Sequence, residues 1–231
     1  MLIKGLQKLT LLDFPSKIAC TVFLGGCNFR CPFCHNASLV IPERLKGEDY
    51  ISEESFFSFL KTRQGILEGV CVSGGEPTLQ VELLDFLKKI KNMGFLVKLD
   101  TNGYRPDVLK SAVSSGLVDY VAMDIKSSRE GYARAVGLEN IDTKRIEESA
   151  SFLMEGKVPF EFRTTVVSGL VSEGDIIKIG EWLAGDEPYF LQPFRDSGDL
   201  ISSEFGGYDE KTLDSLLKVL KRYIPNAQTR G

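Results

Sequence analysis

The sequence is short of histidine, of basic charge and of long apolar runs. His35 is the only histidine in 231 residues, so a Ser-His-Asp hydrolase or a multi-histidine metal site would have to be built around it. The formal net charge of −4 and the lack of a basic stripe argue against nucleic acid as a ligand. No apolar stretch approaches a membrane span, and the first residues lack the apolar region of a signal peptide. We therefore expect a cytoplasmic protein that binds neither nucleic acid nor a membrane.

Cysteine is present, but it is unevenly spread. Cys20 and Cys71 stand alone in apolar runs, where a small buried side chain explains them without any chemistry. Disulfides are rare in cytosolic proteins, so we expect no disulfide framework. The other three cysteines, Cys27, Cys31 and Cys34, lie in one short stretch with two glycines before it and a proline inside it. This stretch is predicted to be a loop rather than a helix.

Three neighbouring cysteines are typical of a metal centre. Three thiolates can hold three irons of a [4Fe–4S] cluster and leave the fourth iron open, whereas electron-transfer clusters usually have four cysteines. A structural zinc bound by the triplet and His35 is one alternative. Haem attachment through the run from Cys31 to His35 is another, although it would leave Cys27 unexplained. The iron–sulfur cluster is the interpretation that we favour.

Apolar, β-rich runs alternate with segments of helical period along the chain. The predicted strands are 18–24, 70–73, 95–99, 117–123, 160–167 and 189–191. The predicted helices are about 52–64, 79–90, 106–114, 146–153, 176–183 and 213–220, and loops are expected at 127–143 and 196–208. This alternation predicts an α/β protein with parallel strands and outer helices. At this length, a partial (βα)6 TIM-like barrel in a single domain, residues 1–231, is favoured over an open doubly wound sheet.

Polar groups follow each of the first four predicted strands. They are the cysteine loop and the runs 74–77 (Gly-Gly-Glu-Pro), 100–103 (Asp-Thr-Asn-Gly) and 124–126 (Asp-Ile-Lys). Ligands of parallel α/β folds bind at the carboxyl ends of the strands, so these groups should converge on one site. The two glycines of the second run allow close approach of the backbone to a ligand, and Glu76 adds a carboxylate beside them.

Two of these motifs resemble a known family. The Cys-x3-Cys-x2-Cys spacing, with Phe33 before the last cysteine, resembles the radical S-adenosylmethionine (SAM) superfamily, and the Gly-Gly-Glu-Pro turn is similar to its motif for the SAM amino group. The stretch 6–15, continuing through 27–36, is similar to the activating proteins of anaerobic ribonucleoside-triphosphate reductase. Those proteins are relatives of pyruvate formate-lyase activating enzyme. The likeness covers most of the chain and is strongest over residues 5–36.

The resemblance implies a mechanism. Cys27, Cys31 and Cys34 would be the catalytic metal ligands, and SAM would chelate the open iron. One electron, from a flavodoxin- or ferredoxin-type donor, would cleave SAM to a 5′-deoxyadenosyl radical. The radical would then take a hydrogen atom from a glycine of a glycyl-radical enzyme. Anaerobic ribonucleoside-triphosphate reductase is the partner that we favour. A small-molecule substrate is the alternative, and a non-catalytic zinc-binding module is the third hypothesis.

The resemblance also implies which residues bind the cofactor. They are Phe33, Gly74, Gly75, Glu76, Asp100, Thr101, Asp124, Lys126, Arg163 and Gln192. The glycines and Glu76 would hold the SAM amino group, and Lys126 its carboxylate. Asp100 and Asp124 would border a monovalent cation. Judged without the resemblance, Lys126 could be a solvated charge and Arg163 could lie on the exposed side of an edge strand. We expect no second cluster. His35 should lie behind the residues that contact the cofactor, or be exposed. Trp182 should pack its helix against the barrel.

Overall fold

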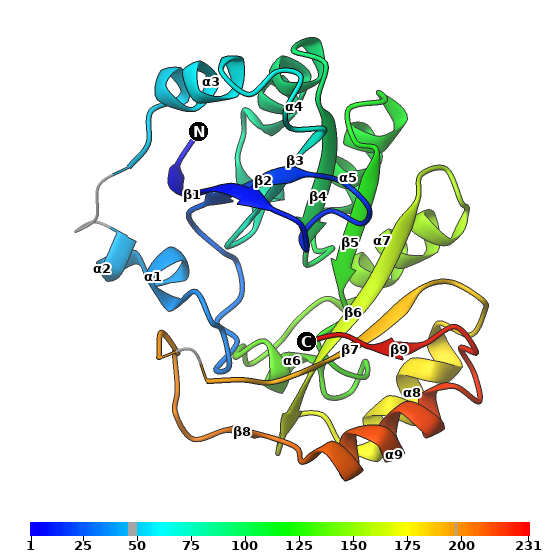
Figure 1. Cartoon of the computed structure of the whole chain (residues 1–231). Coiled ribbons are helices and arrows are strands. Elements are labelled where there is room, and N and C mark those ends of the chain that lie inside the picture. The colour runs from blue at the N-terminus through cyan, green and yellow to red at the C-terminus, as the bar shows by residue number, and fades with distance from the viewer. Residues whose placement is uncertain (46–49, 197) are drawn as a thin grey trace.

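A sheet of mainly parallel strands forms the centre of the chain, and helices lie along its outer side (Figure 1). The computed structural model describes residues 1–45, 50–196 and 198–231. In chain order the strands are β1 (Ile3–Thr10), β2 (Ala19–Leu24), β3 (Gly69–Gly74), β4 (Leu96–Thr101), β5 (Tyr120–Asp124), β6 (Phe160–Ser168), β7 (Tyr189–Pro193), β8 (Gly206–Gly207) and β9 (Gln228–Thr229).

The strand order confirms the predicted partial barrel. Strands β2 to β7 lie side by side in chain order, and all five pairings between them are parallel. Strand β1 extends the sheet antiparallel to β2, and β9 extends the other end parallel to β7. Within the described ranges no pairing joins β1 to β9, so the barrel stays open between these two strands.

The longer helices bury one apolar face against the sheet. They are α3 (Glu53–Lys61), α4 (Leu83–Asn92), α5 (Pro106–Ser114), α7 (Thr143–Met154), α8 (Glu173–Trp182) and α9 (Glu210–Leu220). In α4, for example, Leu83, Phe86, Leu87 and Ile90 are buried, as their helical spacing predicts. Ser52 caps α3 by accepting a hydrogen bond from the N–H of Ser55. None of the helices in the described part of the chain is long and apolar enough to cross a membrane.

Several short elements differ from the sequence prediction. They are β1, β8 and β9, the helices α1 (Ala37–Val40), α2 (Pro42–Leu45) and α6 (Tyr132–Ala135), and the 3-10 turn η1 (Pro77–Leu79). Strand β1 lies at an edge and leaves several residues exposed, so it has no continuous apolar run. The predicted loops at 127–143 and 196–208 contain α6 and β8, which are too short to show a period. Helix α4 begins at Leu83 rather than at 79, because η1 comes first.

Alternation along the strands gives the barrel a polar interior. In β4, Val97 and Leu99 belong to the apolar core, whereas Lys98 lies between them and forms an ion pair with Asp100. Lys98 is only 2% exposed, so its charge is held inside the protein by this partner. Trp182 packs against the apolar core as expected, and the guanidinium of Arg129 lies 4.9 Å from the centre of its ring.

Candidate active site at the carboxyl ends of the strands

A cavity of about 260 Å³ opens where the parallel strands end. All the residues predicted to bind the cluster or SAM line it, together with Phe29, His35, Asn36, Val40, Ser73, Asn102 and Thr165. They come from the cysteine loop after β2 and from strands β3 to β7 or the turns that follow them. The expected convergence of the strand ends is therefore present, while the chemical role of each residue stays a prediction.

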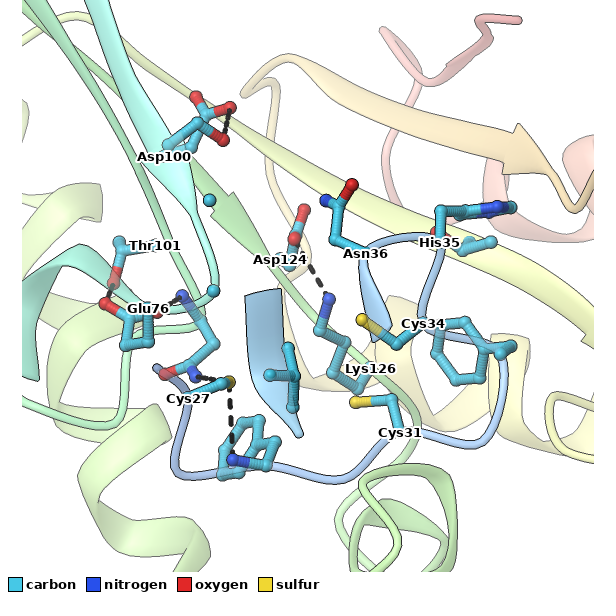
Figure 2. A pocket seen from close by; sticks show the side chains of 18 of the residues that line it. Cys27, Cys31, Cys34, His35, Asn36, Glu76, Asp100, Thr101, Asp124 and Lys126 are labelled. Carbon is cyan, nitrogen blue, oxygen red and sulfur yellow. Dashed lines mark hydrogen bonds and ion pairs between the residues drawn. The ribbon is translucent and has the colours of Figure 1, made fainter. Parts of the chain in front are cut away.

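The cysteine loop runs between β2 and α1 and is held by backbone hydrogen bonds. The N–H of Gly26 donates to the carbonyl of Leu39 at 2.7 Å, and the N–H of Arg30 donates to the carbonyl of Val136 at 2.8 Å. The guanidinium of Arg30 also donates to two carbonyls of the loop. As Figure 2 shows, Cys27 lies across the cavity from Cys31 and Cys34, with Lys126 reaching in between. The loop thus presents three thiols to one cavity.

Burial keeps these thiols protonated in the absence of a metal. It raises the pKa of Cys27 to about 12, with a further contribution from Glu76, and the pKa of Cys31 to about 11. Burial also raises the pKa of Cys34. The charge of Lys126 opposes burial at all three sulfurs. Thiols of this kind ionise when a positively charged metal centre binds, so metal binding should release protons here.

The two glycines at the end of β3 are required by the neighbouring backbone. A Cβ atom at Gly75 would lie 2.1 Å from the carbonyl oxygen of Gly26, and one at Gly74 would lie 2.2 Å from that of Leu24. The φ angle of Gly74 is also +124°, which disfavours any side chain. The N–H of Glu76 donates to the carbonyl of Gly26 at 2.8 Å. The turn after β3 and the cysteine loop are therefore packed directly on each other.

Glu76 joins the ends of β3 and β4. Its side chain is 1% exposed, and its Oε1 accepts hydrogen bonds from the N–H and hydroxyl of Thr78 and from the hydroxyl of Thr101. Oε2 accepts from the N–H of Asn102 at 2.7 Å. Burial raises the pKa of Glu76, and these hydrogen bonds oppose the rise. Three donors bind Oε1 and one binds Oε2, so Oε2 is the oxygen that can accept a further hydrogen bond.

Asp100, Asp124 and three cations form a network on the opposite wall. Nε of Arg163 lies 2.9 Å from Oδ1 of Asp124, and its Nη1 lies 3.5 Å from Oδ2 of Asp100. Nζ of Lys126 lies 3.0 Å from Oδ2 of Asp124, and Lys98 pairs with Oδ1 of Asp100. Arg163 is thus inside the barrel and not on an exposed face.

These contacts decide the charge of the two carboxylates. Burial alone would raise the pKa of Asp124, but Arg163 and Lys126 outweigh it and hold the pKa at about 2. The pKa of Asp100 is lowered for the same reason, since Lys98 and Arg163 outweigh its burial. Both aspartates are therefore ionised at neutral pH.

Phe33, His35 and Gln192 also line the cavity. Phe33 is 3% exposed and belongs to the apolar core. The imidazole of His35 stacks on the ring of Phe194, with 5.3 Å between the ring centres. In the described part of the chain, no three His, Cys, Asp or Glu side chains are grouped around a point where one metal ion would fit.

The sequence prediction missed some residues of the cavity. Ser73 donates to Oδ2 of Asp100 at 3.1 Å, and Asn102 contacts both Glu76 and the cysteine loop. Ser73 directly precedes the Gly-Gly-Glu-Pro run, and Asn102 lies inside the Asp-Thr-Asn-Gly run, so counting every polar residue of the two strand ends would have found both. Thr165 lies two positions after Arg163 on β6, on the same face of the strand.

Comparison with known proteins defines the class. The model of the radical SAM superfamily matches residues 21–183, a range that contains every predicted site residue except Gln192. The chain belongs to the radical SAM superfamily. This membership counts against the zinc and haem alternatives.

Its relatives narrow the class further. A protein of Methanocaldococcus jannaschii, provisionally named a glycyl-radical enzyme activating enzyme, is 31% identical over 238 aligned positions, covering 99% of this chain and 95% of that protein. The pyruvate formate-lyase-activating enzyme of Streptococcus mutans is 28% identical over 218 positions, covering 89% of this chain and 81% of the enzyme. A solved domain of pyruvate-formate lyase-activating enzyme from Bacteroides vulgatus has a TM-score of 0.57 at 21% identity. It covers 71% of this chain and 99% of that domain, and it supports the fold alone.

Proposed function

We propose that this protein is a radical SAM enzyme that installs a glycyl radical on a partner enzyme, with anaerobic ribonucleoside-triphosphate reductase as the first candidate. The observation that carries the proposal is one cavity that combines three thiols with a buried carboxylate and two cations. Its relatives support the glycyl-radical branch, because the named activating enzymes align with most of the chain. The N-terminal stretch supports the choice of reductase by its resemblance.

The residues of the cavity fit an iron–sulfur cluster and SAM. Cys27, Cys31 and Cys34 would hold the cluster, and three ligands leave one iron open for SAM. The close packing of Gly75 on Gly26 leaves no room for a side chain between the turn and the cysteine loop. When bound and reduced, the cluster would supply the electron that cleaves SAM and so generates the radical.

The charged groups of the cavity suit the two ends of the amino acid part of SAM. The ammonium group needs acceptors, and Glu76 Oε2 offers one with a single donor already on it. The carboxylate needs donors, and Lys126 and Arg163 stand on the opposite wall. Asp100 and Asp124 would hold these two cations in position through their ion pairs. We assign Phe33 to the adenine side and Gln192 to the far rim.

A monovalent cation between Asp100 and Asp124 remains part of the proposal, but protein side chains compete with it for the carboxylate oxygens. Each carboxylate oxygen of the two aspartates already accepts from a lysine, an arginine or a serine. A cation would therefore have to displace one of these contacts when SAM enters.

The open barrel suits a large substrate. The sheet does not close between β1 and β9 in the described residues. We propose that a loop of a partner protein reaches the cavity from this side of the barrel. A flavodoxin- or ferredoxin-type protein would deliver the electron. A small molecule would also fit such an opening, so the test must separate SAM cleavage from transfer of the radical.

The test uses the reconstituted, reduced protein under anaerobic conditions. With SAM alone we expect 5′-deoxyadenosine, and with the reductase we expect a glycyl-radical doublet in electron paramagnetic resonance. Alanine at Cys27, Cys31 or Cys34 should abolish both signals. Cys20→Ala is the matched control, because Cys20 is buried in β2 away from the cavity. Cleavage without a radical on any glycyl-radical enzyme would favour a small-molecule substrate, and no cleavage at all would refute the proposal.

A further inference from the structure

Two side-chain amides connect the cysteine loop with the end of β4. Asn102 is 5% exposed and follows Thr101, the last residue of the strand. Its Nδ2 donates to Oδ1 of Asn28 at 2.9 Å and lies 3.9 Å from the sulfur of Cys27. The dashed lines at Cys27 in Figure 2 mark this contact and a second one from the backbone N–H of Phe29 at 3.3 Å. Two nitrogen donors therefore approach the same sulfur.

The hydrogen bonds determine which way each amide faces. Oδ1 of Asn102 accepts from the backbone N–H of Tyr104 at 3.0 Å, so its NH2 group must face the cysteine loop. One hydrogen of that group goes to Asn28, and the other is left for the sulfur of Cys27. A flipped amide would set its oxygen against the carboxamide oxygen of Asn28 and its NH2 against the N–H of Tyr104. The donor at Cys27 is thus built into the fold.

The orientation of Asn28 follows from that of Asn102. Its Oδ1 accepts from Asn102, whereas its Nδ2 is buried and has no hydrogen-bond partner among the described residues. An unpaired buried N–H is costly, and native sites usually satisfy it with a ligand or water. Oδ1 of Asn28 also lies 3.9 Å from the Cys27 sulfur, from whose thiol it can accept a hydrogen bond, so the Asn28 amide contacts both Asn102 and Cys27.

The same residue also contacts the wall assigned to SAM. The backbone N–H of Asn102 donates to Oε2 of Glu76 at 2.7 Å. A shift of Asn102 would thus disturb both the sulfur of Cys27 and the carboxylate of Glu76. The neighbouring wall residue Thr101 binds Glu76 but makes no contact with a cysteine sulfur among the hydrogen bonds of the described chain.

We propose that Asn102 is a positioning residue that donates a hydrogen bond to the Cys27 sulfur in the loaded enzyme, and that Asn28 holds its amide in place. Hydrogen bonds to ligand sulfurs stabilise the more negatively charged, reduced cluster and so raise its reduction potential. Asn102 thereby makes the cluster easier to reduce while its backbone holds Glu76. This inference rests on the cluster of the proposed function.

The test measures the midpoint potential of the reconstituted cluster without SAM, by a redox titration followed with electron paramagnetic resonance. Asn102→Leu removes the hydrogen-bond donor and keeps a side chain of similar size. It should lower the midpoint potential, which shifts the equilibrium between oxidised and reduced cluster by about three- to tenfold toward the oxidised state. Tenfold corresponds to about 59 mV for one electron. Asn28→Leu should shift it in the same direction by less. The control is Asn92→Leu, an exposed position at the end of α4, which should leave the potential unchanged.

Iron and sulfide content separates tuning from a merely structural effect. An unchanged potential in Asn102→Leu would overturn the inference. If the cluster content is lower, the role of Asn102 is structural, and if the content is full, the side chain has no effect on the cluster. If Asn102→Leu takes up too little cluster for its potential to be measured, Asn28→Leu decides, because it leaves the side chain of Asn102 and its contact with Tyr104 in place. If the wild type takes up no cluster, the proposed function fails, and this inference fails with it.

Discussion

Replacing Glu76 by glutamine tests whether its carboxylate both supports the fold and binds SAM. Three donors point at Oε1, so the glutamine oxygen must face them and its NH2 group must replace Oε2. There the NH2 meets the N–H of Asn102, which lies 2.7 Å from Oε2 in the wild type. Two donors would then face each other in a buried place.

The size of the effect follows from this geometry. Loss of the Asn102 hydrogen bond, with both donors left unsatisfied, should lower the free energy of unfolding by about 1–3 kcal/mol. The same change removes the one acceptor that Glu76 can offer to the SAM ammonium. A charge-assisted hydrogen bond of about 1.5–3 kcal/mol predicts a dissociation constant for SAM raised by about 10- to 150-fold.

Thr78→Val provides the control for this prediction. Its hydroxyl contacts only Oε1, so valine should cost a similar hydrogen bond without touching Oε2. Both variants are compared by denaturant unfolding and by equilibrium binding of SAM to the reconstituted protein. Glu76→Gln with weakened folding but normal SAM affinity would show that Glu76 only joins the two strand ends, and the assignment to SAM would be refuted.

Three further changes test other parts of the cavity. Gly75→Ala should lower the free energy of unfolding by about 1–3 kcal/mol, because its Cβ would meet the carbonyl of Gly26, whereas Gly174→Ala, with only an ordinary contact nearby, should not. The pKa of Asp124 falls from 3.8 to about 2 on folding, so its ion pairs should contribute about 2 kcal/mol above pH 4 and lose it between pH 4 and pH 2. Acid unfolding of the wild type should show this loss, and Asp124→Asn should not. Because a monovalent cation between Asp100 and Asp124 is part of the proposal, exchanging potassium for tetramethylammonium at constant ionic strength should raise the dissociation constant of SAM by about tenfold; a change within about twofold would show that Arg163 alone supplies the positive charge between the aspartates.

Much of the fold could be predicted because local and tertiary signals agree there. Helix α5 begins and ends where the sequence predicts, since Pro106 favours its first turn and Gly116 follows its end with a φ of +66°. The six parallel strands contain short apolar runs that pack against the helices, although polar residues such as Lys98 in β4 and Arg163 in β6 interrupt two of them. The additional strands β1 and β9 escape prediction because an edge strand with exposed residues and a two-residue strand leave no apolar pattern.

The site was predictable in its residue types more than in its contacts. The spacing of the cysteines and the strand-end position of Glu76 are visible in the sequence. The partners of Glu76 are not, because Thr101 and Asn102 meet it only through the pairing of β3 with β4. Arg163 illustrates the same limit. Its place inside the barrel depends on the register that sets it beside Asp124, and a shift by one residue would turn it outward.

The wall around Lys126 carries an excess of positive charge. Among the described residues, Lys98, Lys126 and Arg163 form ion pairs with Asp100 and Asp124, so three cations share two carboxylates on this wall. The charge of Glu161 also acts on Arg163, but Glu161 is itself paired with Arg230. The charge of Lys126 lowers the pKa of Cys31 and Cys34 against the effect of burial, which places the surplus beside the thiols. Ionised sulfurs or a ligand carboxylate would balance it, whereas neutral thiols do not. The cavity therefore suits negatively charged groups beside Lys126 and a positively charged ammonium group beside Glu76. Thiolate ligands and the amino acid part of SAM together have this arrangement of charges.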